Sequence, residues 1–344
     1  MITYNEASAT TGQPDPQQGA HNVTDMVQTP CIVGMIGPYN SSVASAEMPI
    51  AANAGLVMIS PANTMPGLTM RLYAGDYGLD FDQLHPAGKQ TNYFRNIAHD
   101  AFQGLELADF ASRQPPAGRG ARSAFVVQDH TPYGEELVGG FAQEFLAHGG
   151  AIVGTDGMPF GGAARIAELA SRIATTRPDV VVHGGTTDNG GGLLQAQLVR
   201  AGYRGLLVGG DGIAEDPVFV DQAGATAAND VFAINPVPDP ASLTSGAAAR
   251  FVHDYHARYP GQDLDGYGAN VYDAAMLLIA AIKHLIRMGQ EVTRQAALEQ
   301  VQTIQYAGIT GPISFDHNGD ITHGVFSLYT VQDGKWVWVK QTSV

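Results

Sequence analysis

The sequence predicts an α/β protein made of two halves, each with a mostly parallel sheet flanked by helices. Short runs that are apolar throughout, such as residues 31–36 and 180–183, alternate with helix-length segments. Strands that are covered on both faces of a sheet have this uniform apolar character. Two breaks rich in Pro, at 114–120 and 235–240, interrupt the alternation. Two α/β halves between which the chain crosses more than once are typical of a two-lobed clamshell.

The composition excludes several classes of partner. The 344 residues allow two domains and an ample core, with 44% hydrophobic and 15% charged residues. A net charge of −15 argues against a nucleic-acid or anionic-membrane surface, because both need basic patches. No stretch approaches the roughly 18–20 apolar residues of a membrane span. Cys31 is the only cysteine, so no internal disulfide is possible, and at the head of an apolar strand it is expected to be buried and inert.

The first half alternates strands and helices up to the first break. Residues 18–28, 43–54 and 100–111 read as helices, and 75–90 as an exposed insertion without periodicity. The helix at 100–111 is amphipathic, with its apolar side chains toward a core: Phe102, Leu105, Leu107, Ala108 and Ala111. Strands are expected at 2–4, 31–36, 56–59 and 93–96.

After the first break the alternation restarts. Strands are expected at 124–127, 151–154, 180–183, 206–209 and 231–234, with helices at 133–149, 166–175, 192–201 and 216–222. Three helices, at 244–258, 270–288 and 293–302, follow the second break. The runs 326–331 and 336–340 flank Asp333-Gly334, which is a strong signal for a β-hairpin.

Small hydroxyl residues follow two neighbouring strands of the first half. Ser41 and Ser42 come after the strand at 31–36, and Ala62 and Thr64 come after the strand at 56–59. A helix-length segment lies between the strands, so both loops belong to the carboxyl edge of one parallel sheet, where ligands bind. Hydroxyls and loop N–H groups suit a carboxylate or another small anion. The alternative is that Ser and Asn simply make turns here.

The second half places different polar groups after its strands. Thr186 and Thr187 follow the strand at 180–183, Asp211 follows the strand at 206–209, and Tyr133 follows the strand at 124–127. A carboxylate accepts charge-assisted hydrogen bonds from an ammonium group. The two halves together predict a site for a free α-amino acid, whose ammonium group binds Asp211. The alternative for Asp211 is a solvated turn residue.

Motifs for catalysis, nucleotides and metals are incomplete. The glycine-rich stretch 184–192 resembles a phosphate cradle but lacks the Gly-Lys-Ser/Thr ending of a P-loop. The stretch 316–320 resembles a calcium loop, but its glycine comes too early and Ser327 stands where a bidentate Glu is needed, so a turn is expected. Neither a Gly-x-Ser-x-Gly elbow nor a His-Glu-x-x-His motif occurs. We therefore expect no catalytic residue, no metal site and no cofactor.

The residues 37–42, Gly-Pro-Tyr-Asn-Ser-Ser, and 58–64, Met-Ile-Ser-Pro-Ala-Asn-Thr, carry a family resemblance. The chain resembles, along nearly its whole length, the periplasmic substrate-binding proteins of branched-chain amino-acid ABC transporters. The resemblance implies a two-lobed type I periplasmic-binding-protein clamshell with the ligand in the cleft between the lobes. Lobe 1 would comprise residues 1–116 plus 237–317, and lobe 2 residues 117–236 plus 318–344.

The resemblance also implies roles for individual residues. Positions matching Ser41, Ala62 and Thr64 hold the carboxylate in the family, and those matching Asp211 and Tyr133 hold the amino group. The family commonly has Glu where this chain has Asp211, and its best-known members have Tyr where this chain has Thr186. A shorter carboxylate and a smaller wall would admit a larger or more polar side chain.

The leading hypothesis is an extracytoplasmic solute-binding protein that captures a small amino acid, branched-chain, aliphatic or related, by hinge closure and delivers it to a membrane permease. The alternatives are a cytoplasmic amide or amino-acid sensor with the same fold, suggested by a first segment without a signal peptide, and an α/β enzyme. The resemblance begins at the second strand of the family fold. An apolar strand and a signal peptide are therefore expected upstream of Met1.

Overall fold

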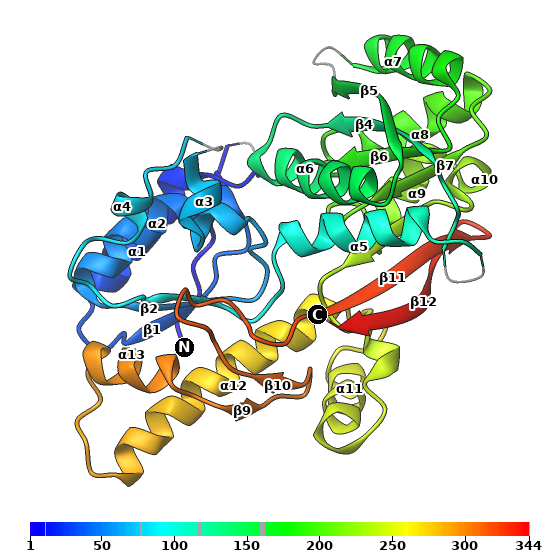
Figure 1. The fold of residues 1–344 in the computed structure, drawn as a ribbon. Coiled ribbons are helices and arrows are strands. Elements are labelled where there is room, and N and C mark those ends of the chain that lie inside the picture. Colours follow the sequence, from blue (N-terminus) through cyan, green and yellow to red (C-terminus); the bar gives the residue numbers. More distant parts are fainter. Residues whose placement is uncertain (11, 76–77, 116–117, 159–161, 344) are drawn as a thin grey trace. The chain divides into compact units, whose positions relative to one another are not determined.

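The computed structural model describes the whole chain except residues 11, 76–77, 116–117, 159–161 and 344 (Figure 1). The chain forms two compact units. Unit 1 comprises Met1–Ala98, Val237–Val325 and Ser343–Val344, and unit 2 comprises His99–Pro236 and Phe326–Thr342. The crossing after Pro236 lies where the sequence placed it, whereas the other two long crossings follow Ala98 and Val325 instead of residues 116 and 317.

The first crossing is early because helix α5 (Asp100–Ser112) belongs to unit 2. It packs against α6 (Pro132–Ala147) and β8 (Phe232–Asn235). The two helices approach closely at Gly104, where an added Cβ would lie 2.5 Å from the backbone nitrogen of Phe141. Only glycine allows two helix backbones to come this near.

The sheet of unit 1 has three parallel strands in the order β1 (Gly34–Ile36), β2 (Val57–Ser60) and β3 (Tyr93–Arg95). Residues of α1 (Pro16–Gln28) and α2 (Ser41–Ala54) form one hydrophobic cluster with β2 and β3, and residues of α12 (Gly266–Arg287) and α13 (Arg294–Gln302) form another. The predicted β-α-β unit β1–α2–β2 is therefore confirmed.

Smaller elements complete unit 1. One short helix lies just before the predicted insertion and another lies within its described residues. The segment after Pro236 adds a helix that is exposed along most of its length and a two-stranded antiparallel ribbon. These elements are η1 (Pro66–Leu68), α3 (Arg71–Ala74), α4 (Phe81–Leu84), η3 (Pro240–Ser242), α11 (Gly246–Arg258), β9 (Tyr306–Ala307) and β10 (Pro312–Ile313).

Helix α12 is, by length and composition, the one described helix that could cross a membrane. Its buried side chains, which include Leu277 and Leu278, pack on β1, β2 and α13. Asp273, in the same helix, accepts hydrogen bonds from the backbone N–H groups of Ile309 and Thr310. These contacts are those of a core helix.

Three expectations for unit 1 and its border were wrong. Residues 2–4 form no strand, and the first bridge in the described part of the chain joins Ala7 and Pro14. Cys31 is exposed, since β1 begins only at Gly34. Phe102 is 39% exposed, and the neighbouring Gln103 is buried in its place.

Unit 2 has a seven-stranded sheet in the order β12-β11-β8-β7-β6-β4-β5. The five strands β5, β4, β6, β7 and β8 are parallel, and β11 runs antiparallel to β8. The remaining elements are β4 (Ser123–Gln128), β5 (Ala151–Gly157), α7 (Ala163–Thr176), β6 (Val180–Gly184), α8 (Gly191–Arg200), β7 (Leu206–Gly209), α9 (Pro217–Ala223), α10 (Ala225–Ala228), β11 (Val325–Gln332) and β12 (Lys335–Ser343).

The hairpin predicted at Asp333-Gly334 is confirmed. Both residues have positive φ values, 49° and 72°, which a two-residue type I′ turn requires. Behind the turn, the indole N–H of Trp336 donates to the carbonyl of Asp216 at 2.9 Å, and this bond fixes the hairpin to α9.

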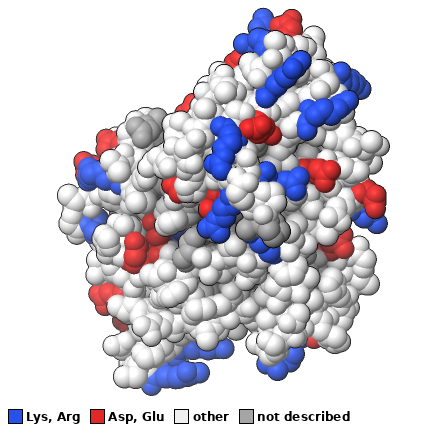
Figure 2. Space-filling model, turned by 45° about the vertical axis from the view of Figure 1, so that its right-hand side comes forward, with Lys and Arg blue, Asp and Glu red and all other residues white. Residues whose placement is uncertain are grey.

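Charged side chains of both signs share the surface. On the face shown in Figure 2, Lys and Arg side chains lie among Asp and Glu side chains, and large areas carry neither. Several of the charges form exposed ion pairs, such as Arg71–Asp82 and Arg113–Asp109. Pairs of this kind contribute little to stability because water and salt screen them, so the hydrophobic clusters hold the fold.

Candidate functional site

The hydroxyl loops of unit 1 lie side by side at the carboxyl edge of its sheet. The register pairs Ile36 with Ile59, so β1 and β2 end together. The hydroxyl of Ser60 donates to the carbonyl of Pro38 at 2.8 Å and accepts from the N–H of Asn63 at 2.9 Å. Ser41 Oγ accepts from the N–H of Met65 at 3.4 Å. Each loop therefore holds the other in place.

The four predicted residues of this edge differ in exposure. Ala62 and Thr64 are 7% and 4% exposed, Ser41 is half-buried, and Ser42 is exposed. Among the described residues, neither the hydroxyl nor the N–H of Thr64 has a hydrogen-bond partner. Thr64 therefore has two donors to offer a ligand, and Ser42 lies at the outer end of the group.

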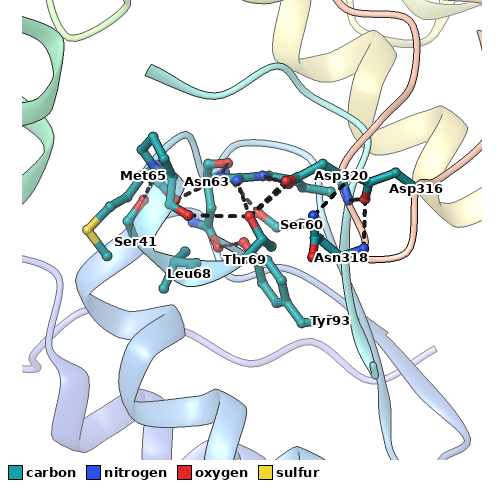
Figure 3. A network of polar contacts seen from close by, with 12 residues as sticks. Ser41, Ser60, Asn63, Met65, Leu68, Thr69, Tyr93, Asp316, Asn318 and Asp320 are labelled. Atoms are coloured by element: carbon teal, nitrogen blue, oxygen red, sulfur yellow. Dashed lines mark hydrogen bonds and ion pairs between the residues drawn. The ribbon is translucent and has the colours of Figure 1, made fainter. Parts of the chain in front are cut away.

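A buried polar network supports the loop that carries Thr64 (Figure 3). Asn63 Nδ2 donates to the carbonyl of Tyr39 at 2.7 Å, and Asn63 Oδ1 accepts from the hydroxyl of Tyr93 at 2.9 Å. Burial raises the pKa of the Tyr93 phenol, so this group stays protonated and remains a donor.

Arg95, at the end of β3, is the centre of this network. Its side chain is fully buried, and its Nε donates to Asp320 Oδ1 at 2.5 Å. Its Nη2 donates to Thr69 Oγ1 at 2.5 Å, and its Nη1 donates to the carbonyls of Met65 at 2.8 Å and Asn63 at 3.3 Å. The guanidinium group thus contacts the residues on both sides of Thr64.

Asp320 belongs to the stretch 316–320, for which the sequence predicted a turn. The turn is present, because Asp316 Oδ1 accepts from the N–H groups of Asn318 and Asp320 at 2.9 Å. The carboxylate of Asp320 points away from this turn and accepts from Thr69 Oγ1 at 2.9 Å (Figure 3). No local signal in the sequence indicated this long-range contact.

In unit 2, Asp211 follows β7 and is held by one amide side chain. Its Oδ1 accepts from Gln103 Nε2 at 2.9 Å, and its own N–H donates to Gln103 Oε1 at 3.2 Å. Gln103 Nε2 also donates to Asp100 Oδ1 at 2.8 Å. Asp100 and Gln103 are fully buried whereas Asp211 is half-buried. Two acidic side chains are therefore gathered around one amide group.

Tyr133, near the start of α6, lies beside the same loop. Its hydroxyl accepts from the N–H of Gly212 at 2.9 Å. Desolvation, and then the negative charges of Asp211 and Asp100, raise the pKa of the phenol well above its usual value. The hydroxyl is thus a donor at neutral pH in a negatively charged environment.

The glycine-rich loop after β6 binds mainly to itself and to Asp129. The N–H of Thr186 donates to Asp129 Oδ2 at 3.3 Å, and Asn189 Nδ2 donates to the same oxygen at 2.8 Å. The N–H groups of Gly190 and Gly191 donate to carbonyls of the loop. A phosphate cradle needs such N–H groups to bind its ligand, and here they already donate to the protein itself. The structure therefore argues against a nucleotide site at this loop.

The loops after β6 and β7 are joined. The N–H of Thr187 donates to the carbonyl of Gly212 at 3.0 Å, which sets Thr186 near the segment that carries Asp211. The Thr187 hydroxyl is buried and has no hydrogen-bond partner among the described residues. Tyr133, Thr186 and Asp211 therefore lie at one edge of the unit 2 sheet.

The sequence missed five residues that organise the two loop groups: Thr69, Arg95, Asp100, Gln103 and Asp129. Asp100 and Gln103 are three residues apart on α5 and share one helix face. The assignment of Phe102 to the core hid this buried polar face, because Gln103, and not Phe102, is the buried side chain.

Other features of the described residues do not involve these loops. No group of three or more His, Cys, Asp or Glu side chains in the described part of the chain could hold a metal ion. A surface hollow of about 920 Å³ between β5 and α7 is lined by residues such as His130, Met158 and Arg165. None of the seven predicted site residues lines that hollow.

Comparisons with known proteins match the chain to a family, to curated relatives and to solved structures. A family model described as periplasmic binding protein matches residues 11–335. The Leu/Ile/Val-binding protein BraC3 of Rhizobium johnstonii is 27% identical over 326 residues, which cover 94% of this chain and 79% of that protein.

Solved structures show the same fold. The leucine-binding protein LivK of Thermotoga maritima superposes with a TM-score of 0.77 at 23% identity, covering 95% of this chain and 84% of LivK. A solute-binding protein from R. palustris, solved in complex with benzoate, gives a TM-score of 0.72 at 21% identity, covering 96% and 83%.

Proposed function

The chain belongs to the periplasmic binding protein family, and on that premise we propose that it binds a small aliphatic amino acid and delivers it to an ABC transporter. The relative from Rhizobium johnstonii is named for binding Leu, Ile and Val. The neighbour from R. palustris holds benzoate instead. The two proteins bind ligands of different classes, so the residues of this chain's own loops are the basis for its ligand class.

Asp211 is the observation that carries the proposal. It is a half-buried carboxylate held by Gln103, with Asp100 and Tyr133 beside it. Such a group favours a cation with N–H donors, and it disfavours a ligand that carries only a carboxylate. An α-amino acid has an ammonium group for Asp211, whereas benzoate has none.

The loops of unit 1 supply the complementary group. Thr64 offers a hydroxyl and an N–H, and Ser41 and Ala62 lie on the same pair of loops. We assign the ligand carboxylate to these three residues and the ammonium group to Asp211 and Tyr133. Thr186 and the exposed Ser42 are assigned to the surroundings of the ligand side chain. Because one ligand then engages loops of both units, binding would favour the conformations in which both loops reach it.

The proposal includes the cellular setting. The protein would work outside the cytoplasm, release its ligand to a membrane permease and catalyse no reaction. Recovery of the ligand chemically unchanged after prolonged incubation supports binding without turnover, and appearance of a product contradicts it.

A thermal-shift screen tests the ligand class. The probes are leucine, isoleucine and valine, together with 4-methylpentanoate, which lacks the ammonium group, 3-methylbutylamine, which lacks the carboxylate, and benzoate. A ligand at 100 times its dissociation constant adds about 2.7 kcal/mol to the stability of the native state. We expect a rise in Tm with at least one amino acid and none with benzoate. A rise with benzoate or 4-methylpentanoate alone would overturn the proposal.

Substitution of the unit 1 hydroxyls tests the carboxylate assignment. Ser41→Ala and Thr64→Ala should each weaken amino-acid binding by about 1–3 kcal/mol, because a buried carboxylate oxygen loses a donor. Calorimetry measures the change, and Ser42→Ala is the matched control, with a smaller effect expected at its exposed position. If 3-methylbutylamine bound to the wild-type protein as tightly as leucine, the assignment would fail.

A further inference from the structure

Buried polar groups hold the loop that carries Thr64, beside the buried apolar side chains of Met65 and Leu68. Arg95 Nη1 donates to the carbonyls of Asn63 and Met65, one on each side of Thr64. A single guanidinium group that bonds two carbonyls of one loop restricts both flanking peptide units at once. The direction in which Thr64 presents its N–H and hydroxyl therefore depends on Arg95.

Arg95 is in turn held by two side chains. Asp320 accepts from Nε at 2.5 Å, and Thr69 Oγ1 accepts from Nη2 at 2.5 Å. Thr69 also donates to Asp320 Oδ2 at 2.9 Å, so the three side chains close a ring of hydrogen bonds. Buried charges are tolerated when they are paired and hydrogen-bonded in this way.

A buried ion pair is a costly way to hold a loop if stability is its only purpose. Replacing such a pair with apolar side chains is often neutral or stabilising. The pair instead fixes the orientation of the loop, because the hydrogen bonds of a guanidinium group lie in one plane and at fixed angles. The ring Arg95–Thr69–Asp320 is therefore better suited to orientation than to stability.

We propose that Arg95, fixed by Asp320 and Thr69, is a positioning residue for the ligand carboxylate: it holds Thr64 with its donors toward the ligand and does not touch the ligand itself. This inference rests on the proposed function. It also makes a claim about the loop alone, namely that the ring orders residues 62–65 whether or not a ligand is bound.

Thr69→Val is the test variant, because valine keeps the shape of threonine and removes the hydroxyl. We expect the affinity for leucine to fall about 3- to 30-fold, a range typical of residues that act through others. The affinity for 3-methylbutylamine, which has no carboxylate, should change less than twofold. Thr69→Ser keeps a hydroxyl and should restore most of the leucine affinity. Equal losses for both compounds would mean a general structural defect and would overturn the proposal.

A double substitution tests whether Thr64 and Thr69 act on the same interaction with the ligand. In a Thr64→Ala background, Thr69→Val should weaken leucine binding by a smaller factor than in the wild type, because both substitutions act on one interaction. Full additivity contradicts the proposal.

The matched control is Arg294→Lys. Arg294 also bonds backbone carbonyls, those of Met26, Val27, Thr29 and Ile32, at distances of 2.9 to 3.2 Å. It belongs to the same unit, and none of its hydrogen bonds in the described part of the chain reaches either ligand loop. Its substitution should lower the Tm and leave the leucine affinity unchanged.

Amide hydrogen exchange tests the loop without a ligand. The amides of residues 62–65 should exchange faster in Thr69→Val than in the wild type, and at an unchanged rate in Arg294→Lys. If the wild-type protein binds no amino acid but this difference appears, the proposed function fails and the ordering of the loop by the ring stands. If leucine binds and the exchange rates are equal, the positioning role is wrong.

Discussion

Replacing Asp211 with Ala is expected to weaken amino-acid binding by about 2–5 kcal/mol, the usual result of removing one partner of a buried charge pair. The substitution removes the acceptor for the ligand ammonium group. It also takes one acceptor from the fully buried Gln103. Titration calorimetry with leucine measures the loss, and Asp211→Asn, which keeps the shape but not the charge, should lie between Ala and wild type.

Asp179 provides the matched control for Asp211. It lies at the amino edge of the same sheet, where its carboxylate accepts from the N–H groups of Arg122 and Ser123. Asp179→Ala should lower stability and leave affinity unchanged. An Asp211→Ala protein with wild-type affinity would show that Asp211 is not the ammonium ligand.

Replacing Glu47 with Gln is expected to stabilise the protein by about 3 kcal/mol at pH 7. Glu47 is 2% exposed on α2, and burial, with the nearby Glu6 as the second cause, raises its pKa to about 8. Its Oε2 has no hydrogen-bond partner among the described residues. Folding at pH 7 therefore requires this carboxyl group to take up a proton, which glutamine does not need.

The sign of the pH dependence follows from the raised pKa. Well below pH 4.5 the carboxyl group is protonated in the folded and the unfolded state, so its ionisation does not lower the free energy of unfolding. As the pH rises from 4.5 toward 8, only the unfolded state loses the proton, so the free energy of unfolding falls. Above about pH 8 both states are ionised and the loss is complete. The advantage of Glu47→Gln should accordingly grow between pH 5 and pH 8.

Urea unfolding of both proteins at several pH values measures this difference. Burial lowers the pKa of His85 and His183, so these groups also contribute to the pH dependence of stability. Because they are common to both proteins, the difference in free energy isolates Glu47. A difference that stays constant from pH 5 to pH 8 would contradict the raised pKa.

The sequence predicted the elements of the two sheets because their signals are local. Uniform apolar runs mark β2, β6 and β7, and Asp333-Gly334 marks the final hairpin. The boundaries of the two units were harder to predict from the sequence. Where α5 packs is decided by its close approach to α6 at Gly104, and helical periodicity alone cannot name the partner of a helix.

For the candidate site, too, only local signals could be used. The positions of Ser41, Thr64 and Asp211 at the carboxyl edges of the sheets could be predicted because each follows an apolar strand, and such an edge is a general position for ligands. Arg95 and Asp320 could not, since their ion pair joins residues 225 positions apart in the chain. Cys31 was misplaced for a local reason: the apolar run begins before the strand does.

The order of strands in unit 2 has a consequence for how the chain folds. β8 is bordered on one side by β7, which precedes it, and on the other by β11, which is made only after all of α11, α12 and α13. A growing chain therefore carries an unpaired β8 edge through the synthesis of the second segment of unit 1. Such late, long-range pairing slows folding and leaves an edge open to association. Native folding of unit 2 must wait for β11 and β12, and until they are made the free edge of β8 is exposed to association with other chains.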